Sequence, residues 1–281
     1  MKKQTTFFTQ KRMKQLQTVV AVVCFLFMIF PLYWLFSSSL KTEASVFARP
    51  PEIFPMHPTL DAYITQLNQV TFDILGSFKN SLLISFCTMM TLAIPAAYGL
   101  ARFRIKGKNL IVFLFLVSQM LPQIFTLIPN FIIFKKIGIY NTYWAPILSN
   151  CTLAIPFSLM MMRAFFVGIP TEIDEAARID GCNAFQSFIR VMLPMSANGL
   201  AVTFVFSFLF GYQDMMYSLT YVTDSAMWPV TTGIYNVVGR YGVEWCRAMA
   251  FGCMAVLPVI LIFVFMQKYI VQGLTAGAVK G

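Results

Sequence analysis

The chain has 281 residues, of which 58% are hydrophobic and 11% are charged. Soluble domains have about 45–50% apolar and about 25% charged residues, so this chain lacks the charge that a water-exposed surface needs. These figures argue against a cytosolic enzyme, and the high hydrophobicity excludes an intrinsically disordered protein. The formal net charge is +10, which in a soluble protein would suggest nucleic acid as a partner.

Six long stretches without Asp, Glu, Lys or Arg follow one another along the chain, at 15–40, 80–101, 109–134, 137–162, 191–213 and 248–267. A transmembrane helix needs about 20 apolar residues, whereas barrel strands are shorter and alternate in polarity. We therefore expect an all-α integral membrane protein with six transmembrane helices, at about 17–38, 80–101, 110–131, 143–163, 195–217 and 248–267. The first stretch exceeds the apolar run of a signal peptide and lacks a cleavage site, so we expect it to remain as a span.

The expected six-helix domain, 17–270, lies between an N-terminal segment, 1–16, and a C-terminal tail, 271–281. Six spans place both ends of the chain on one side of the membrane, and that side carries twice as many Lys and Arg residues as the other. Its most basic loop is Arg102–Lys108. The positive-inside rule then predicts cytoplasmic termini in a bacterial plasma membrane. The expected topology accounts for the net charge of +10, so that charge does not indicate a nucleic-acid partner.

The residues typical of catalytic and metal sites are sparse. The six cysteines form no C-x-x-C pair, and His57 is the only histidine. No phosphate-binding G-x-x-x-x-G-K-[ST] motif and no G-x-S-x-G motif occurs. We expect no catalytic residue, metal or cofactor on this chain.

The expected loop between spans four and five, 169–194, resembles neither a simple turn nor a membrane-surface helix. Its first half predicts a helix that starts at Pro170 and Thr171, with Asp174 completing a capping box, and stops at Gly181. Its expected exposed face contains Ile173, Ala176, Ala177 and Asp180, and the two small alanines would let another surface approach closely.

The second half of the loop predicts a helix capped by Asn183 and ended by Pro194, with an apolar stripe of Phe185, Phe188, Ile189, Met192 and Leu193. A helix lying on the bilayer usually carries Lys and Arg on its polar face. The first helix here carries mainly acids, at Glu172, Asp174, Glu175 and Asp180. A protein partner is therefore favoured over lipid.

The segment Glu175-Ala176-Ala177, followed by Gly181 and by Leu193-Pro194, resembles the EAA loop of ATP-binding-cassette importer permeases. In that family the loop forms a coupling helix that sits in a groove of a separate ATPase subunit. The resemblance implies that the chain is a transport subunit and that ATP and Mg²⁺ bind on the partner. The implied ATPase-coupling residues are Glu172, Glu175, Ala176, Ala177, Arg178, Asp180, Gly181 and Pro194.

The segment 267–281, together with Asn141–Trp144 and the Pro-rich stretch 50–60, is similar to carbohydrate importer permeases of the maltose type. This resemblance implies the second permease of a heterodimer, two ATPase subunits and an extracellular or periplasmic sugar-binding protein. It also places the tail between the ATPases, with Gly273, Thr275 and Gly277 as contacts in an extended chain. Importers for polyols or glycerol phosphate look similar, so the cargo stays open.

Polar side chains inside membrane spans are candidates for a substrate pathway, because exposure to lipid is costly. Amides, acids and tyrosines suit sugar hydroxyls. The candidates are Gln119, Gln123, Asn130, Asn150, Gln213, Asp214 and Tyr217. Hydrogen bonding between helices is the alternative role for each neutral group.

Two other functional classes remain possible on the sequence alone. An ion-gradient-driven secondary transporter of a small polar solute would explain six spans and Asp214, but not the acidic loop helix. A membrane-embedded enzyme has no supporting motif. The external segment 218–247 suits either a surface that faces the binding protein or a lid on the pathway.

Overall fold

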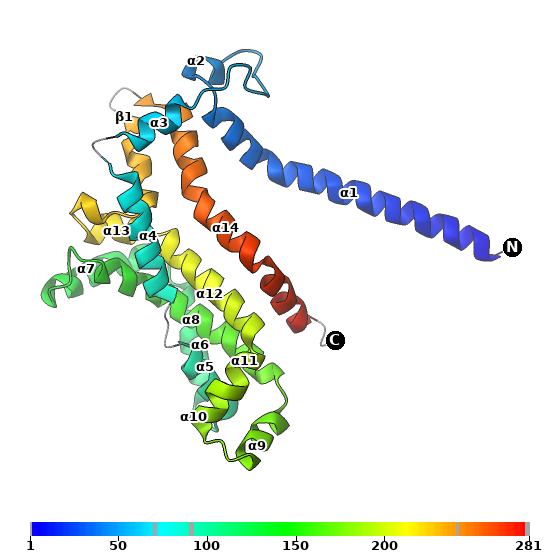
Figure 1. Cartoon of the computed structure of the whole chain (residues 1–281). Helices are drawn as coiled ribbons and strands as arrows, with labels where there is room; N and C mark the ends of the chain where they lie inside the picture. Colours follow the sequence, from blue (N-terminus) through cyan, green and yellow to red (C-terminus); the bar gives the residue numbers. More distant parts are fainter. Residues whose placement is uncertain (1, 70–71, 90–92, 240–241, 279–281) are drawn as a thin grey trace. The chain divides into compact units, whose positions relative to one another are not determined.

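The computed structural model describes residues 2–69, 72–89, 93–239 and 242–278. The described backbone is mostly helical (Figure 1). It divides into two compact units. The first unit contains residues 1–69 and 237–254, and the second contains 70–236 and 255–281. The long C-terminal helix α14 (Trp245–Ala278) contributes to both units.

The first unit consists of one long helix and several short elements: α1 (Lys2–Ser39), α2 (Glu43–Val46), α3 (Asp61–Leu67) and an antiparallel pair, β1 (Val238–Gly239) and β2 (Gly242–Val243). The start of α14 is capped from α2, because Cys246 N donates to Glu43 Oε1 at 2.8 Å. A negative group at a helix N-terminus satisfies free N–H groups and favours the helix dipole. Arg247 Nε donates to Gln66 Oε1 at 3.3 Å, which links the same turn of α14 to α3.

The second unit is built around the central helix α8 (Trp144–Gly168), which packs against α4, α5, α6, α12 and α13. Its helices and helical turns are α4 (Ile74–Met89), α5 (Ala93–Arg102), α6 (Lys108–Met120), α7 (Ile124–Lys136), α9 (Thr171–Ile179), α10 (Ala184–Ser187), the π-helical turn η1 (Phe188–Met192), α11 (Leu193–Met195), α12 (Ala197–Tyr212), α13 (Met216–Tyr221), and the 3-10 turns η2 (Ser225–Met227) and η3 (Val230–Asn236).

Small and hydroxyl-bearing residues allow α12 to approach its neighbours closely. A Cβ atom on Gly211 of α12 would lie only 2.7 Å from Ser85 Cα of α4. One turn earlier on α12, the hydroxyls of Ser207 and of Ser158 on α8 are 2.7 Å apart and both are buried. Both features are typical of helix pairs in membranes, where small residues and hydroxyl contacts replace hydrophobic driving force.

Four stretches are long and apolar enough to cross a bilayer: Met13–Ser39, Trp144–Gly168, Trp245–Val271, and Ile74–Arg102, which consists of α4 and α5 with residues 90–92 between them outside the described part of the chain. Two further pairs pass the same test together but are bent at a short break. Lys108–Met120 and Ile124–Lys136 meet at 101°, and Ala184–Met195 and Ala197–Tyr212 meet at 82°. The described chain therefore contains between four and six candidate spans, by length and composition.

The span expected over about 110–131 consists of two helices with a break between them. The helix α6 ends at Met120, and Leu121 has the extended backbone angles φ −76° and ψ 121°. Leu121 precedes Pro122, whose ring disfavours a helical conformation at the preceding residue and which has no N–H to donate. The bend between α6 and α7 follows from this local chemistry.

The expected bounds of two other helices also differ from the structure. The helix expected over 195–217 is interrupted after Tyr212, because the Asp214 carboxylate accepts the backbone N–H groups of Tyr217 and Ser218 at 3.1 and 3.2 Å and so begins α13. The helix expected from residue 80 begins earlier, at Ile74, where Asp73 Oδ1 accepts from Gly76 N at 3.0 Å.

The segment that follows α13 is held against the second unit by two asparagines. Asn141 has a φ of 59°, and its Oδ1 accepts the N–H groups of Thr223 and Asp224 at 2.8 and 3.0 Å. Asparagine is among the few residues that adopt this left-handed conformation readily. Asn80 Nδ2 donates to two carbonyls of the same segment, at 2.8 and 3.0 Å. These bonds fix the course of the chain between α13 and η3.

Candidate functional site

The helix α9 occupies the loop between α8 and α12, at the opposite end of the second unit from α13 (Figure 1). The prediction that Gly181 stops this helix is confirmed, because Gly181 has a φ of +84°. Gly181 N donates to Arg178 O at 3.1 Å, and Cys182 N donates to Ala177 O at 2.9 Å. This pair of bonds is the Schellman arrangement, in which a left-handed residue satisfies the last carbonyls of a helix.

The predicted capping box at Thr171 and Asp174 is wrong, because the residue before the helix is Pro170 and no side chain caps it. Asp174 instead turns inward and is 8% exposed. Its Oδ1 accepts the Tyr98 hydroxyl at 3.1 Å and the Ser187 hydroxyl at 3.0 Å, and its Oδ2 lies 2.8 Å from Arg102 Nε. We call these four residues, Asp174, Arg102, Tyr98 and Ser187, the Asp174 cluster.

The Asp174 cluster joins α9 to three other elements. Tyr98 and Arg102 lie one turn apart at the end of α5, and Ser187 ends α10. Arg102 Nη2 also donates to Ile169 O, at the end of α8, at 2.8 Å. Asp174 and Arg102 thus form a close ion pair, and each of them makes at least one hydrogen bond to a neighbouring element as well. The cluster therefore fixes the position of α9 relative to α5 and α8.

Aromatic packing supports the Asp174 cluster from inside the unit. The Tyr98 ring centroid lies 5.0 Å from that of Phe188 and 5.6 Å from that of Phe166. Phe166 and Met162 of α8 are fully buried in the same apolar core. Aromatic pairs at these distances contribute about 0.5–1.5 kcal/mol beyond the burial of their area.

The face that α9 exposes differs from the one expected. Ala177 is buried at 5% exposure, so only Ala176 of the two alanines lies outside. The helix is anchored through Asp174, and Ala177, one turn later on the same face, must also point inward. The exposed residues of the predicted coupling set are Glu172, Glu175, Ala176, Arg178, Asp180, Gly181 and Pro194. Ile179, which was not predicted, is 85% exposed beside them.

The second half of the loop follows the predicted pattern in part. Asn183 caps α10 as expected, and Gln186 returns the bond to the Asn183 N–H at 3.0 Å. The predicted apolar stripe is divided, because Phe188 and Met192 are buried whereas Phe185 is 69% exposed. Pro194 does not end the helix. It lies in the first turn of α11, where a missing N–H costs nothing, and the chain turns at Ser196.

The C-terminal tail is helical where the resemblance implied an extended chain. The helix α14 continues through Gly273, Thr275 and Gly277 to Ala278, and Gly281 lies outside the described residues. Glycine costs about 1 kcal/mol relative to alanine inside a helix. These glycines nevertheless lie within α14, which continues without interruption from the apolar span into the tail.

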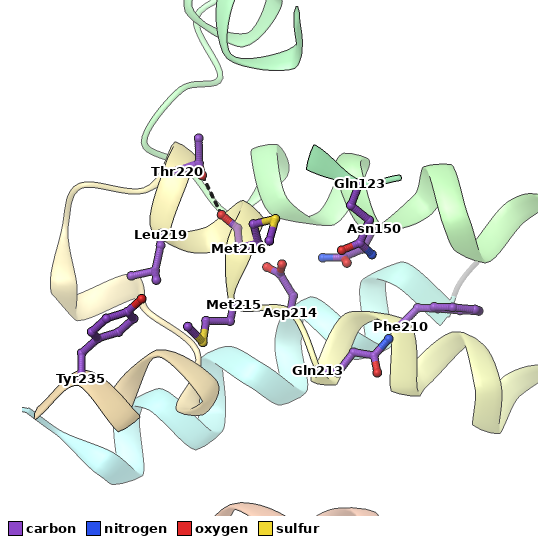
Figure 2. Close-up of a pocket in the computed structure, with 10 residues that line it drawn as sticks. All are labelled: Gln123, Asn150, Phe210, Gln213, Asp214, Met215, Met216, Leu219, Thr220 and Tyr235. Atoms are coloured by element: carbon purple, nitrogen blue, oxygen red, sulfur yellow. Dashed lines mark hydrogen bonds between the residues drawn. The ribbon is translucent and has the colours of Figure 1, made fainter. Parts of the chain in front are cut away.

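A cavity of about 480 Å³ lies within the second unit, near the break between α12 and α13 (Figure 2). It brings together four of the predicted pathway residues, Gln123, Asn150, Gln213 and Asp214. The other lining residues are Phe210, Met215, Met216, Leu219, Thr220 and Tyr235. A cavity of this size that combines apolar walls with a few polar groups is typical of small-molecule sites.

Three predicted pathway residues do not line the cavity. Tyr217 is 1% exposed and packs in the core, where its ring stacks on Tyr221 with centroids 5.9 Å apart. Its hydroxyl lies 3.2 Å from that of Thr126, which joins α13 to α7. Gln119 and Asn130 lie on α6 and α7, outside the lining.

The structure adds residues that sequence reasoning missed. Arg102 was counted only as a positive charge in a basic loop, and neither Tyr98 nor Ser187 was singled out. The sequence contains one hint of this cluster: Arg102 stands at the end of a span, and Asp174 stands on the same helical face as Ala177. Within the described residues, no group of three or more His, Cys, Asp or Glu side chains could hold a metal ion.

Comparison with known proteins identifies the family. Residues 89–276 match the family described as binding-protein-dependent transport system inner membrane component. The probable ABC transporter permease protein YurM of Bacillus subtilis (strain 168) is 32% identical, covering 94% of this chain and 89% of that protein. The trehalose/maltose transport system permease protein MalG of Thermococcus litoralis is also 32% identical, covering 94% of both chains.

A solved structure shares the fold. A chain of a bacterial ABC transporter that imports the acidic polysaccharide alginate superposes with a TM-score of 0.76, at 19% identity, covering 93% of this chain and 98% of that one. The family match spans well over half of the chain, and the relatives cover nearly all of it. The chain therefore belongs to the family of binding-protein-dependent transport system inner membrane components, which are multi-pass membrane proteins.

Proposed function

We propose that this chain is the permease subunit of an ATP-binding-cassette importer for a carbohydrate, with ATP hydrolysed on separate subunits. The observation that carries the proposal is α9, a short acidic helix that is held from inside by the buried Asp174 cluster and exposes its charged outer face. A helix that served only as a connection would need no such anchor. A helix that transmits force from a partner needs a fixed attachment to the spans.

The proposed topology has six spans, with each bent helix pair counted as one. The support is the charge distribution of the sequence, which favours a cytoplasmic position for both termini, for the loop after α5 and for α9. The four acids of the 169–194 loop then lie among basic cytoplasmic loops. This topology places α9 where a soluble ATPase can reach it.

In the proposed mechanism, ATP binding closes two ATPase subunits, and their grooves move the α9 helices of two permease chains. Glu172, Glu175 and Ile179 form the outer surface of α9 that enters the groove. The Asp174 cluster carries the displacement to α5 and α8. Nucleotide binding on one chain and cargo access on another are thereby coupled, as linkage between two sites requires. ATP and Mg²⁺ belong to the ATPase.

The proposed cargo class rests on the relatives and on the cavity. The Thermococcus litoralis relative is named for trehalose and maltose transport, and the cavity presents amides, a carboxylate and aromatic rings. We propose that a binding protein delivers a sugar or oligosaccharide to a pathway shared with a second permease. A polyol would suit the same groups.

Co-purification tests the proposal directly. The tagged chain, expressed with its second permease and ATPase, should retain the ATPase in detergent. Ile179→Glu should abolish retention, because Ile179 is 85% exposed and its loss leaves the permease core intact. The matched control Ile53→Glu changes an exposed isoleucine of the first unit, 58% exposed, and should retain the ATPase. Absence of ATPase from the unmodified preparation would favour the ion-gradient-driven alternative.

A further inference from the structure

The cavity at the α12–α13 break is lined by one acidic side chain, and its other polar side chains are neutral. Of its ten described lining residues, three carry amides and one, Asp214, carries a charge. The apolar lining includes Met215, Met216 and Leu219. A single carboxylate among amides and apolar groups sets the sign of the electrostatic potential in the cavity.

The Asp214 carboxylate is held in place from behind. Its Oδ1 accepts Tyr217 N at 3.1 Å, and its Oδ2 accepts Ser218 N at 3.2 Å and the Ser218 hydroxyl at 2.7 Å. These donors come from the first turn of α13, and they fix the orientation of the carboxylate. Figure 2 shows the carboxylate pointing toward Asn150 and Gln123, on the cavity side. Asp214 is 5% exposed, so solvent screens it little.

The remaining lining groups suit a ligand rich in hydroxyls. The side chains of Gln123, Asn150 and Gln213 offer both donors and acceptors, and Tyr235 and Phe210 offer rings. The cavity volume of about 480 Å³ lies within the range of small-molecule sites, which is roughly 300–1,000 Å³.

We propose that this cavity is a cargo subsite on this chain that accepts neutral or amine-bearing saccharide units and excludes anionic ones, with Asp214 as the group that sets this preference. The proposal rests on the proposed function and deepens it, because it restricts the class of carbohydrate. A uronate or a sugar phosphate would bring a second negative charge against a buried one, with no basic residue among the described lining to compensate. A neutral hydroxyl can instead donate to the carboxylate.

Charged thiol reagents measure the sign of the potential in the intact transporter. Gln213 lies beside Asp214, lines the cavity and is exposed, so Gln213→Cys gives a reporter there. The complex of both permeases and the ATPases is treated with methanethiosulfonates that carry either a trimethylammonium or a sulfonate group. Labelling of the unmodified chain, which has six cysteines of its own, is subtracted.

The rate of labelling by the cationic reagent is divided by the rate for the anionic reagent, and this ratio is normalised to the same ratio for free cysteine. The normalised ratio should exceed about 10 for Gln213→Cys, and it should fall toward one when Asp214→Asn is added. The control Asp224→Asn removes an exposed acid of the neighbouring segment and should leave the ratio high. A ratio near one, an equal fall in the control, or no labelling by either reagent would overturn the proposal.

Trisaccharides of different charge test the ligand class in the same preparation. Chitosan trimer and maltotriose should slow labelling of Gln213→Cys by at least about threefold, whereas trigalacturonate should slow it only after Asp214→Asn is added. Equal protection by trigalacturonate without that change, or protection by none of the three, would refute the subsite. Co-purification of the ATPase is scored separately, so loss of the subsite and loss of the importer assignment are distinguishable.

Discussion

Removing the negative charge of Asp174 should separate the importer's ATPase cycle from transport. The substitution Asp174→Asn keeps the shape of the side chain and leaves an oxygen for Tyr98 and Ser187, but it removes the ion pair with Arg102. The guanidinium of Arg102 would then remain buried beside a neutral amide.

The magnitude follows from the burial of the pair. The side chains of Arg102 and Asp174 are 7% and 11% exposed, so solvent can replace little of the lost interaction. Breaking a buried pair by removing one partner costs about 3–5 kcal/mol, because the other charge is left uncompensated. The whole cost falls on the attachment of α9. An equilibrium between attached and detached α9 would shift by roughly 100-fold or more.

The assay compares coupling with folding. The complete importer is reconstituted in proteoliposomes, and ATP hydrolysis is measured with and without the cargo-loaded binding protein. Asp174→Asn should leave the protein inserted while the stimulated rate approaches the basal one. Hydrogen exchange at the amides of Thr171–Ile179 should accelerate by a similar factor. Arg104→Gln, which neutralises an exposed arginine in the same basic loop, is the matched control and should change neither quantity.

A double-mutant cycle gives the sharpest test. Arg102→Met alone should be as harmful as Asp174→Asn, but the double variant should be milder than the sum, with a coupling energy of about 1–3 kcal/mol. Strict additivity, or normal stimulation by Asp174→Asn, would refute the assignment of Asp174 as the residue that positions α9.

Three further predictions concern backbone geometry and the tail. Gly181→Ala should impair transport more than Gly181→Asn in an uptake assay, because the φ of +84° costs an ordinary residue about 1–2 kcal/mol and asparagine less. Gly211→Ala should lower the melting temperature of the detergent-solubilised chain, because the new methyl group would clash with Ser85 at a cost of about 1–3 kcal/mol. The control Gly99→Ala should leave the melting temperature unchanged, because its new methyl group would lie 3.8 Å from the nearest neighbour. Deleting Thr275–Gly281 should reduce the stimulated ATPase rate at unchanged insertion, and an unchanged rate would show that the tail makes no contact that matters for coupling.

Long apolar runs predicted the helices well, because inside a bilayer a helix is the structure in which a single segment satisfies its own backbone N–H and C=O groups. The breaks were harder to predict. Pro122 signals a bend through its own covalent structure, but a proline within a helix, such as Pro156 of α8, gives the same sequence signal without a break. Neighbouring helices that satisfy the freed backbone groups decide between the two outcomes.

The position of the anchor could not be read from local sequence. Helical periodicity shows that Asp174 and Ala177 share a face, but it does not show which face of α9 packs inward. That choice depends on Arg102, which is far away in the chain and meets Asp174 only after α5 packs against α8. The cavity could not be read from local sequence either, because its polar groups come from separate parts of the chain: Gln123 precedes α7, Asn150 lies inside α8, and Asp214 lies between α12 and α13.

The π-helical turn η1 has a consequence for the length of the chain between α9 and α12. At its end, Leu193 N donates to Phe188 O, five residues back, so the turn contains one residue more than a regular α-helical turn. Phe188 and Met192 both remain in the core despite the surplus residue. Deleting one residue within η1 would give a regular α-helical turn, in which the N–H of the present Leu193 would still reach Phe188 O, now four residues back. The surplus residue is therefore accommodated inside η1, and the turns before and after it keep their rotation relative to each other.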